Sequence, residues 1–406
     1  MKSFIKKFIP SFFIAWYHFS LAFCGALFYC FPSRKIKVIG ITGTNGKTTV
    51  SEMALRVLEK AGYKASLVNS IRFKIGKEER PNLLKMTMPG RFKIQRFIYQ
   101  AVKAKSQYIV LEITSEGIKQ YRHKFINFHS ALFTNLSPEH IESHGSFEKY
   151  RQAKIKLFRA TKNIHIINID DPSANYFLSV PANKKYTYGL NQGDINNKDL
   201  QLNLRLIGNF NVYNGLAAVC LGLSQGISPK LAKQAVEEMQ GIPGRLEEVV
   251  SFPFKVIVDY AVTPDSLERL YQTLIKHFSP QQIIAVFGSC GGGRDKWRRP
   301  ALGKIAAKYC SKIIITNEDP YDDDPTEIVD QIARGIDKAE QSPPVLKILD
   351  RRQAIAAALK SARPGDMVVI TGKGCEPWIC LAKGKKIAWD DRLVVKEEFA
   401  MLKNGL

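Results

Sequence analysis

Acidic residues are scarce in this 406-residue sequence, which has 37 Asp and Glu against 60 Lys and Arg and a net charge of +23. Such an excess is typical of proteins that bind nucleic acid or acidic lipid. The basic residues are spread along the chain rather than gathered in one arm, which argues against nucleic-acid binding. We expect no nucleic-acid partner; strongly salt-dependent binding to DNA or RNA would be the sign of that rival function.

Paired cysteines are also missing, because the seven Cys are scattered, odd in number and form no CxxC pair. Their distribution excludes a disulfide framework and a cysteine zinc site, and it suits a reducing cytoplasm. With 45% apolar and 24% charged residues, the composition is that of a folded chain rather than a disordered or multi-span protein. At about 100 to 200 residues per domain, the length predicts two or three domains.

Charge is absent from one long stretch near the N-terminus. Residues 8–31 contain no charged side chain, whereas Lys6 and Lys7 precede them and Arg34 and Lys35 follow. The stretch is long enough to cross a bilayer, which needs about 20 apolar residues. Ten of its 24 residues are aromatic, and a proline and polar residues interrupt it. A membrane span, a helix at the membrane interface and a helix packed on the protein all remain open.

A glycine loop follows the short β-branched run at residues 35–41 and precedes a helical pattern. Its sequence is Thr42-Gly43-Thr44-Asn45-Gly46-Lys47-Thr48-Thr49. The order strand, loop, helix points backbone N–H groups and a helix N-terminus at phosphate oxygens. We expect Lys47 to contact the terminal phosphates of ATP and the Thr48 hydroxyl to bind Mg²⁺. The spacing is not the common GxxxxGK[ST], because Ile41 replaces the first glycine.

This loop, GTNGKTT, resembles that of the Mur ligases, ATP-dependent enzymes that add amino acids to the peptidoglycan precursor. The resemblance runs from Lys35 to Leu406 and is closest to the tripeptide synthetases. It implies that ATP is bound by Gly43, Thr44, Asn45, Gly46, Lys47, Thr48 and Thr49. Family members usually begin with a uridine-binding domain, and 34 residues before Lys35 are too few for one. We therefore expect weak binding of UDP or a substrate presented differently, for example at a membrane.

Further residues match positions of Mur ligases that bind metal. Glu112 ends the apolar run YIVLE, and a carboxylate at the end of a parallel strand beside a phosphate loop is well placed for Mg²⁺. The resemblance implies that His140 binds a second Mg²⁺ and that Lys154 reacts with CO₂ to form a carbamate. Glu139 stands where the family usually has Asp. The expected metal ligands are thus Thr48, Glu112, His140 and Lys154, and the expected catalytic residues Lys47, His140 and Lys154.

A second set of Mur ligase elements lies around a Gly/Pro break at residues 241–247. Before the break, Asn211 and Asn214 precede an apolar helical run and match asparagines near the adenine, a task suited to amides. After it, alternating strand and helix patterns predict a second parallel sheet. Arg245 and Asp259 match positions near the ATP phosphates and ribose. The family motif DYAHTPD is here DYAVTPD, with Val262 in place of His.

Two clusters resemble the tripeptide synthetases, which add the third amino acid. Residues matching the site for the muramoyl dipeptide are Thr87, Thr114, Gln120 and Arg122. Residues matching the site for the incoming amino acid are Arg294, Glu318, Asp319, Pro320, Tyr321, Gly372 and Glu376. Cys375 replaces the usual His in the last motif.

The choice of amino acid is where the match departs. Enzymes that add diaminopimelate carry DNPR, whose Arg pairs with the distal carboxylate of that amino acid. The corresponding residues here are Glu318-Asp319-Pro320-Tyr321, followed by three further aspartates, residues 322–324. Without the Arg and with carboxylates nearby, the pocket suits a distal ammonium group. The sequence therefore predicts L-lysine or another basic diamino acid, unless the three aspartates only form a solvated turn.

The predicted fold is α/β. A central P-loop ATPase domain with a parallel sheet spans residues 34–243 and a Rossmann-like C-terminal ligase domain spans 244–406, after the apolar segment 1–33. The predicted reaction joins an amino acid to UDP-N-acetylmuramoyl-L-Ala-D-Glu through an acyl phosphate, with ATP and Mg²⁺ as cofactors. Rival functions are a related ligase acting on a lipid-linked or other carboxylate, and a membrane-tethered ATP-binding regulator without ligase activity. We expect a cytoplasmic monomer, with residues 8–31 as a contact with the inner face of the plasma membrane.

Overall fold

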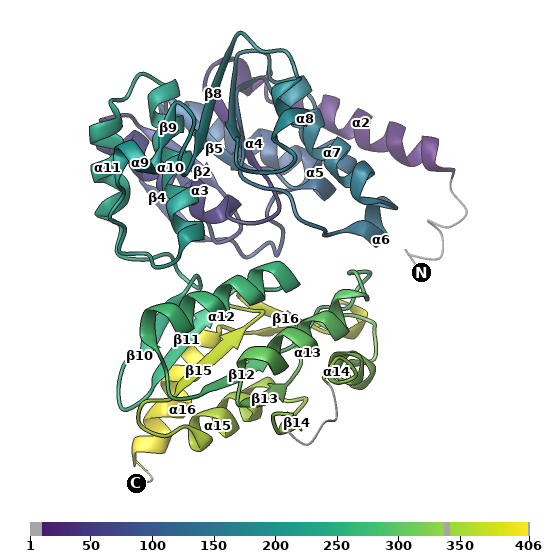
Figure 1. Ribbon diagram of the computed structural model, residues 1–406. Helices are drawn as coiled ribbons and strands as arrows, with labels where there is room; N and C mark the ends of the chain where they lie inside the picture. Colours follow the sequence, from purple (N-terminus) through teal and green to yellow (C-terminus); the bar gives the residue numbers. More distant parts are fainter. Residues whose placement is uncertain (1–9, 337–341, 405–406) are drawn as a thin grey trace. The chain divides into compact units, whose positions relative to one another are not determined.

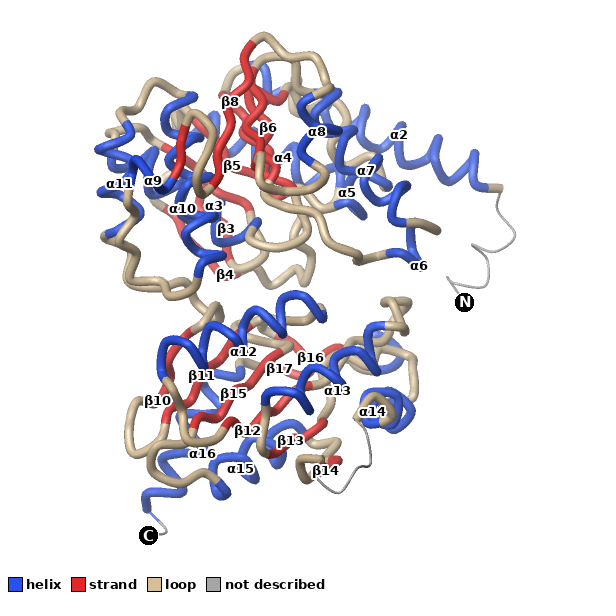
Figure 2. Tube along the Cα trace, in the orientation of Figure 1, coloured by secondary structure: helices blue, strands red, loops and turns tan. Residues whose placement is uncertain are grey.

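A computed structural model describes residues 10–336 and 342–404, which form two compact units. The first contains residues up to Ser137, Phe147–Arg205 and Asn209–Met239. The second contains Pro138–Ser146, Leu206–Gly208 and the chain from Gln240 onward. Each unit is a sheet with helices on both faces, as Figure 2 shows in red and blue. The α/β class is therefore confirmed, and so are the two parallel sheets.

The sheet of the first unit has nine strands in the order β4-β3-β2-β5-β1-β6-β7-β8-β9. Strands β3 and β4 pair antiparallel to their neighbours, and the remaining pairs are parallel. The strands are β1 (Lys37–Thr42), β2 (Ala65–Val68), β3 (Arg72–Ile75), β4 (Glu78–Pro81), β5 (Tyr108–Glu112), β6 (Phe128–Phe133), β7 (Ile164–Asn168), β8 (Lys184–Gly189) and β9 (Ile195–Asn196). The central strand β1 is buried after its first residue, as expected for an apolar run inside a parallel sheet.

Helices cover both faces of this sheet (Figure 1). One face carries α3 (Lys47–Lys60), α10 (Asn209–Ser224) and α11 (Pro229–Glu237). A second group comprises α2 (Ser11–Phe28), η1 (Pro32–Arg34), α4 (Arg91–Lys103), α5 (Ser115–Lys119), α7 (Phe147–Ala160) and α8 (Ala174–Leu178). From this group, α4, α7 and α8 share a buried core with the strands. The short α9 (Asn197–Leu200) follows β9.

The sheet of the second unit has six strands in the order β10-β11-β15-β12-β13-β14, with β10 antiparallel. The strands are β10 (Glu247–Val250), β11 (Lys255–Asp259), β12 (Ile283–Phe287), β13 (Lys312–Ile315), β14 (Val345–Lys347) and β15 (Met367–Thr371). A separate ribbon pairs β16 (Trp378–Cys380) with β17 (Lys386–Ala388). The carboxyl ends of parallel strands β11, β15, β12 and β13 meet at one edge, where ligands bind in open α/β sheets.

Helices of the second unit form two buried cores, one on each face of the sheet. One face carries α12 (Pro264–Phe278), α13 (Arg298–Tyr309) and α14 (Pro325–Ala333), and the other α15 (Arg351–Ser361) and α16 (Asp391–Asn404). Two short elements are α6 (Ile141–His144) and η2 (Ala382–Gly384). The start of α12 is fixed locally, because Thr263 and Ser266 form a capping box and Pro264 occupies the first turn.

The apolar N-terminal stretch is largely helical. Of the predicted stretch 8–31, residues 8 and 9 lie outside the described residues, and α2 accounts for Ser11–Phe28. The helix packs against α4, so the expectation of a helix resting on the protein is met in part. Among the described residues, none of the helices has the length and apolar character that crossing a bilayer requires.

Candidate functional site

The glycine loop lies between β1 and α3 at the carboxyl end of the central strand. Residues that follow the neighbouring strand β6 hold it in place. Asn135 Oδ1 accepts a hydrogen bond from Asn45 N–H at 2.9 Å, and the Thr134 hydroxyl donates to Asn45 O at 2.7 Å. The loop is thus attached to the sheet through its backbone, on both the N–H and the C=O of one residue.

Two glycines let the loop turn tightly. Gly43 has φ 152° and Gly46 has φ 82°, and both values disfavour any residue with a side chain. A Cβ at Gly43 would lie 1.9 Å from Thr134 Oγ1, and one at Gly46 would lie 2.3 Å from Asn214 Oδ1. Because no side chain fits at either position, the backbone can approach a phosphate closely.

Lys47 is the first residue of α3 and folds back over the loop. Its ammonium group donates to Gly43 O at 3.1 Å and to Thr44 O at 2.7 Å. The Thr44 hydroxyl lies 3.0 Å from the Tyr150 hydroxyl of α7, which ties the loop to that helix. A cation and the N-terminal N–H groups of α3 together suit anionic oxygens.

Thr48 and Glu112 meet as the sequence predicts, and a serine joins them. Thr48 Oγ1 donates to Glu112 Oε2 at 3.0 Å, and the same oxygen accepts from the N–H and hydroxyl of Ser70 at 3.1 and 3.0 Å. The Ser70 hydroxyl also lies 2.8 Å from Thr87 Oγ1. A hydrogen-bonded series therefore runs from Thr87 to Thr48, and its hydroxyl and carboxylate oxygens are ligands of the type that Mg²⁺ prefers.

Lys154, on α7, lies against the same loop. Its side chain is 1% exposed, and its ammonium group donates to Gly43 O at 2.6 Å and lies 4.6 Å from the centre of the Tyr150 ring. Lys47 and Lys154 thus share one carbonyl oxygen. A buried lysine on a core helix is costly unless its charge is paired or used.

The asparagines predicted to lie before a helix are in fact inside it. Helix α10 begins at Asn209, so Asn211 and Asn214 occupy its first turns and share one face at a spacing of three residues. Asn214 Nδ2 donates to Asn211 Oδ1 at 3.0 Å, and both side chains are buried. The helix thereby brings the amide of Asn214 to Gly46 of the glycine loop.

Three of the four residues predicted for the muramoyl dipeptide flank α5, and the fourth, Thr87, contacts Ser70. Thr114 caps this helix by accepting from Gly117 N–H at 3.0 Å, and Gln120 Oε1 accepts from Arg122 Nη2 at 2.8 Å. Arg91, on α4, donates to the Gln120 carbonyl at 2.8 Å. Burial, with a smaller effect from the charge of Arg91, lowers the pKa of Arg122. Arg91 and Arg122 give this region positive charge, partly offset by Glu116, and such charge suits carboxylate or phosphate groups.

His140 belongs to the second unit rather than the unit that contains the glycine loop. It lies at the N-terminal end of α6 with φ 56°, and one nitrogen of Arg294 lies 3.4 Å from each ring nitrogen. The Asp295 carboxylate accepts the N–H groups of Ile141 and Glu142 at 3.1 and 3.0 Å. The segment containing His140 is thus held by the loop that contains Arg294.

Buried charges gather where β13 and β15 end. Lys373 Nζ lies 3.0 Å from both oxygens of Asp319 and 2.7 Å from Glu376 Oε2. The side chains of Lys373 and Asp319 are 0% and 2% exposed. Tyr260, after β11, donates to Glu376 Oε1 at 3.2 Å. We call Lys373, Asp319, Glu376 and the adjoining Glu318 and Cys290 the acidic cluster.

Glu318 has an unusual partner in this cluster. The Cys290 thiol, after β12, donates to Glu318 Oε1 across 2.7 Å. Burial raises the pKa of Glu318, although Arg298 and the thiol partly offset the effect. Burial also raises the pKa of Cys290, so the group is a thiol rather than a thiolate. The ligand atoms of Cys290, Glu318 and Asp319 lie within 4.8 Å of one another, but Lys373 already compensates the charge of Asp319.

Tyr321 occupies the position at which diaminopimelate-adding enzymes have Arg. Its N–H donates to Cys380 O at 3.1 Å, and a Cβ at Gly292 would lie 2.7 Å from its ring. Burial and the nearby Asp319 carboxylate raise the pKa of Tyr321, so its phenol is neutral. Pro320 precedes Tyr321 in the chain. Gly372, with φ 107°, lies against Glu318, because a Cβ at this position would be 2.7 Å from Glu318 Oε2. A neutral ring cannot form the charge-assisted pair that Arg forms.

The three aspartates after Tyr321 have structural partners. Asp322 accepts from Lys383 N–H at 2.8 Å, and Asp323 lies 3.3 Å from Arg299, whose side chain is 2% exposed. Asp324 caps α14 by accepting from Thr326 N–H at 2.9 Å. These contacts account for the three carboxylates without an amino-acid ligand, so the case for a distal ammonium rests on Tyr321 in place of Arg.

The remaining predicted residues lie near the start of the second unit. The guanidinium of Arg245 lies 4.4 Å from the centre of the Tyr260 ring and donates to Gly244 O at 3.1 Å. Asp259 ends β11 and accepts the N–H groups of Leu246 and Ala261, each at 2.7 Å. The Cys375 thiol donates to Pro243 O at 3.3 Å.

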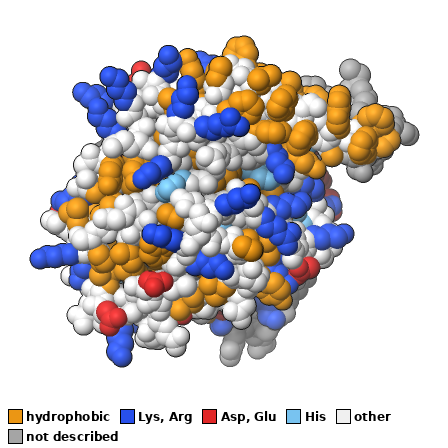
Figure 3. Space-filling model, turned by 90° about the horizontal axis from the view of Figure 1, so that it is seen from above, with side chains coloured by type: hydrophobic (Ala, Val, Ile, Leu, Met, Phe, Trp, Pro, Cys, Tyr) orange, Lys and Arg blue, Asp and Glu red, His pale blue; other side chains and the backbone are white. Residues whose placement is uncertain are grey.

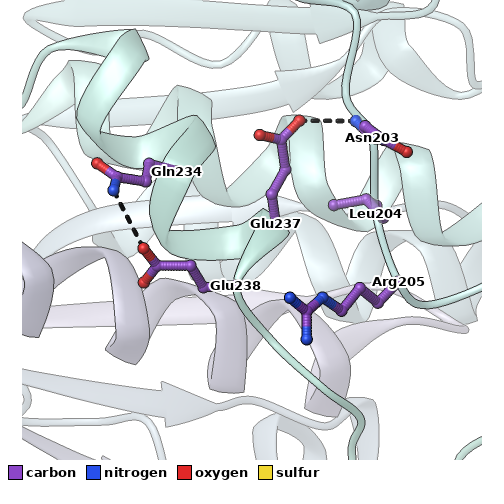
Figure 4. Close-up of a pocket in the computed structure, with 6 residues that line it drawn as sticks. All are labelled: Asn203, Leu204, Arg205, Gln234, Glu237 and Glu238. Carbon is purple, nitrogen blue, oxygen red and sulfur yellow. Dashed lines mark hydrogen bonds between the residues drawn. The ribbon is translucent and has the colours of Figure 1, made fainter.

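A pocket of about 340 Å³ lies apart from the predicted residues, between α11 and the segment before α10 (Figure 4). In the first unit it is lined by Asn203, Leu204, Arg205, Gln234, Glu237 and Glu238. Glu237 accepts from Asn203 N–H at 2.7 Å, and Glu238 forms an ion pair with Lys60 at 2.9 Å. The two carboxylates of the lining thus already have partners within the protein.

Four residues of these sites escaped the sequence analysis. Ser70 bridges Thr87 and Glu112, Asn135 holds the glycine loop, Arg91 adjoins Arg122, and Lys373 organises the acidic cluster. For Lys373 a signal existed, because it lies in residues 372–377, GKGCEP, between Gly372 and Glu376, which match the site for the incoming amino acid.

Comparison with known proteins agrees with this geometry. Family models described as "Mur ligase middle domain" and "Mur ligase, glutamate ligase domain" match residues 41–222 and 244–374. A relative from Syntrophomonas wolfei, named UDP-N-acetylmuramoyl-L-alanyl-D-glutamate–2,6-diaminopimelate ligase, is 38% identical over 402 residues, covering 93% of this chain and 81% of the relative. A UDP-N-acetylmuramyl-tripeptide synthetase from a Roseiflexus species is 32% identical, covering 95% and 83%.

Solved structures give the same result. The structure of a UDP-N-acetylmuramoyl-L-alanyl-D-glutamate–2,6-diaminopimelate ligase aligns with a TM-score of 0.57 at 29% identity, covering 91% of this chain and 79% of that one. A folylpolyglutamate synthase from Mycobacterium tuberculosis, at 16% identity, has a TM-score of 0.69, covers 87% and 92%, and shares the fold. The two family models and the relatives, which align over most of their length, place this chain in the Mur ligase family, as an ATP-dependent acid–amino-acid ligase.

Proposed function

We propose that this enzyme joins a diamino acid to UDP-N-acetylmuramoyl-L-Ala-D-Glu. The observation that carries the proposal is the hydrogen-bonded series Thr87–Ser70–Glu112–Thr48. It joins a residue matched to the muramoyl dipeptide with the loop matched to ATP. The names of the relatives support the same substrate and the same type of reaction.

The proposed reaction needs two steps. The dipeptide carboxylate attacks the γ-phosphorus of ATP, which gives an acyl phosphate and releases ADP. The amine of the diamino acid then attacks the acyl carbon, which forms the amide and releases phosphate. Lys47 and the N–H groups at the start of α3 bind the phosphates and offset the charge that gathers on them. Arg122 and Gln120 hold the dipeptide, and Asn211 and Asn214 lie near the adenine.

The oxygen-rich pair Thr48 and Glu112 fits Mg²⁺, because both offer hard oxygen ligands at the end of a strand. Bound Mg²⁺ supplies additional positive charge at the phosphates. Ser70 orients the Glu112 carboxylate for that role. We assign His140 and a carbamate on Lys154 to a second metal on the family resemblance, and Arg245 and Asp259 to ATP on the same ground. Replacing Lys154 by Ala and adding a short carboxylic acid tests the carbamate, because full activity without the acid would exclude it.

For the amino acid, we propose L-lysine. The support is the neutral Tyr321 in place of Arg, with Glu318, Asp319, Gly372, Glu376 and Arg294 completing the matched set. A second candidate is diaminopimelate, which the names of the relatives favour. L-lysine has no distal carboxylate, so it leaves no group in need of the missing Arg.

Phosphate release from ATP tests both proposals. The purified chain is given UDP-N-acetylmuramoyl-L-Ala-D-Glu with lysine, ornithine or diaminopimelate, one at a time and then in competition. Release that needs both the dipeptide and lysine supports the proposal. Diaminopimelate as the best substrate overturns the choice of lysine but keeps the ligase. ATP binding without release for any pair favours a lipid-linked substrate or the regulator.

We also propose that residues 8–31 contact a membrane and that the chain is a monomer. The support for the membrane contact is the uncharged, largely exposed helix α2. For the catalytic domains we propose the boundaries 34–243 and 244–406, which follow the Gly/Pro break in the sequence.

A further inference from the structure

Helix α2 turns its small residues inward and its large residues outward. Ala22 and Ala26 are 2% and 0% exposed, and a Cβ at Gly25 would lie 3.3 Å from Phe92 on α4. The small face therefore packs against α4. Large side chains that remain exposed are Phe12, Phe13, Trp16, Tyr17, Phe19, Phe23, Leu27 and Phe28. A helix facing water normally carries its apolar residues inward and charges outward, which is the reverse of this arrangement.

Hydrophobic side chains accordingly gather on this projecting helix, which Figure 3 shows in orange. Phe13 and Trp16 are 58% and 63% exposed, on the part of α2 farthest from its contact at Gly25. No charged residue occurs in Ser11–Phe28. A contiguous apolar surface of this kind marks a site of contact with a protein or a membrane.

The outer face of α4 continues this surface with alternating aromatic and basic residues. Phe92, Arg96, Tyr99 and Lys103 recur every three or four residues, so they form one stripe. All four are exposed. Tyr29, just after α2, lies 6.1 Å from the Phe92 ring and 5.4 Å from the Tyr99 ring between centres. The apolar helix and the basic stripe are therefore one continuous surface.

Acidic residues are missing from the sequence around this surface. Residues 80–111, which include α4, contain seven Lys and Arg and no Asp or Glu. Residues 1–51, which include α2, contain no Asp or Glu either. An anionic partner would therefore meet attractive charges from both segments, and a neutral or cationic partner would gain nothing from them.

We propose that α2 and the outer face of α4 together bind the surface of a membrane that contains anionic lipid. The inference rests on the membrane contact proposed above and adds to it the lipid class and the second helix. Aromatic side chains such as Trp16 and Tyr17 suit the depth of the headgroups, and the α4 cations suit the phosphates. Because the small face of α2 is packed on α4, the helix lies along the membrane surface rather than crossing it.

Vesicle co-sedimentation of the full chain tests the proposal, with phosphatidylcholine alone and with added phosphatidylglycerol. The wild type should bind the anionic vesicles and release them as salt rises. The triple variant K93E/R96E/K103E should bind them at least tenfold more weakly, since each cation near such a surface contributes about a factor of five. A matched control, K162E/K184E/K198E, reverses three exposed lysines outside α2 and α4. Its decrease in the logarithm of the binding constant should be less than half of the decrease in K93E/R96E/K103E.

The second variant, F13S/W16S, removes two exposed aromatic residues and leaves the charge unchanged. It should weaken binding to anionic vesicles, whereas near-wild-type binding would overturn the role of α2. Equal binding of wild type to both vesicles would overturn the lipid class. The wild type could instead bind no vesicle and form dimers in analytical ultracentrifugation that are lost in F13S/W16S. This result would overturn the membrane proposal and show that the surface binds a second copy of the chain. Phosphate release is measured without vesicles, so loss of the ligase function and loss of membrane binding are told apart.

Discussion

The glycine loop of the first unit and the acidic cluster of the second are built from different groups. Thr134 and Asn135 hold the loop at the backbone of Asn45, and its conformation depends on two glycines. Lys47 and Lys154 also donate to a loop carbonyl, that of Gly43. Charged side chains hold the acidic cluster, where Lys373 lies between Asp319 and Glu376 with almost no exposure to water. The two lysines at the loop donate to a neutral carbonyl group, whereas Lys373 of the acidic cluster pairs with two carboxylates.

This difference predicts how each site responds to mutation. Lys47 is only partly buried and donates to neutral carbonyl groups, so removing it should cost activity and leave the fold intact. A charged residue in the acidic cluster compensates another buried charge, so removing it should cost the fold as well. Four measurements test the contrast.

The largest effect is expected at Lys373. Replacing it by Met leaves the Asp319 carboxylate buried without its cation, which should lower the free energy of unfolding by about 3–5 kcal/mol. Urea unfolding at neutral pH measures this. The matched control is Lys308→Met, which breaks an exposed pair with Glu268 and should leave the free energy of unfolding nearly unchanged. The double variant D319N/K373M should recover part of the loss. Equal stability of the two single variants would contradict the role of buried charge.

Lys47 should show the opposite behaviour. In Lys47→Ala, phosphate release should fall by about 10²–10³-fold, because a preorganised cation no longer meets the phosphates. Its free energy of unfolding should change by less than about 0.5 kcal/mol. Lys60→Ala, on the same helix and paired with Glu238, is the control and should keep its activity. The contrast between the sites fails when K47A unfolds as readily as K373M.

Acid should affect the stability of the two units with opposite signs. Burial lowers the pKa of His123 in the first unit from 6.5 to about 4. Between pH 6.5 and pH 4 the unfolded chain binds a proton on His123 that the folded protein does not bind. The free energy of unfolding should therefore be largest above pH 6.5 and fall by about 1–3 kcal/mol as the pH drops toward 4. Glu318 has the opposite sign, because its raised pKa means that protonation favours the folded state.

Urea unfolding at pH 7 and pH 5 measures the effect of His123. The variant His123→Asn should lose part of the pH dependence between these values, because burial also lowers the pKa of His129 and His165. His277→Asn, at an exposed position, should retain the full dependence. An unchanged slope in H123N would show that other groups carry the acid sensitivity.

The smallest effect is expected at Ser70, which orients Glu112. In Ser70→Ala the apparent affinity for Mg²⁺ should fall about tenfold, as it does when a residue that supports a metal ligand is removed. A magnesium titration of phosphate release measures it. Ser106→Ala removes a buried hydroxyl that pairs with Ser66 elsewhere in the same sheet, and it should leave the titration unchanged. The same shift in both variants would indicate a general effect on the sheet.

Local patterns allowed much of this molecule to be predicted. The strand before the glycine loop was expected at residues 35–41 and is found as β1, Lys37–Thr42, and the strand YIVLE coincides with β5. The sequence places Asn211 and Asn214 before the apolar helical run, whereas α10 already begins at Asn209. Asn214 donates to Asn211 within the helix, which a pattern based on apolar residues does not register.

The residues that were missed depend on distant partners. Ser70 and Glu112 are 42 residues apart, and Lys373 and Asp319 are 54 residues apart. The fold brings such pairs together by placing strand ends side by side, and no spacing in the sequence reveals which polar residue will face which. The aspartates 322–324 were also misjudged as a possible ligand site: Asp324 caps a helix locally, whereas Asp322 and Asp323 contact residues far away in the sequence, Lys383 and Arg299.

The series from Thr87 through Ser70 and Glu112 to Thr48 has a thermodynamic consequence. A ligand that fixes the Thr87 hydroxyl restricts the rotation of Ser70, and Ser70 in turn restricts Glu112. Peptide and metal should therefore bind cooperatively, and linkage requires each to tighten the other by the same factor. Calorimetric titration of one ligand in the presence and absence of the other would yield that factor twice, as two independent readings of a single coupling free energy.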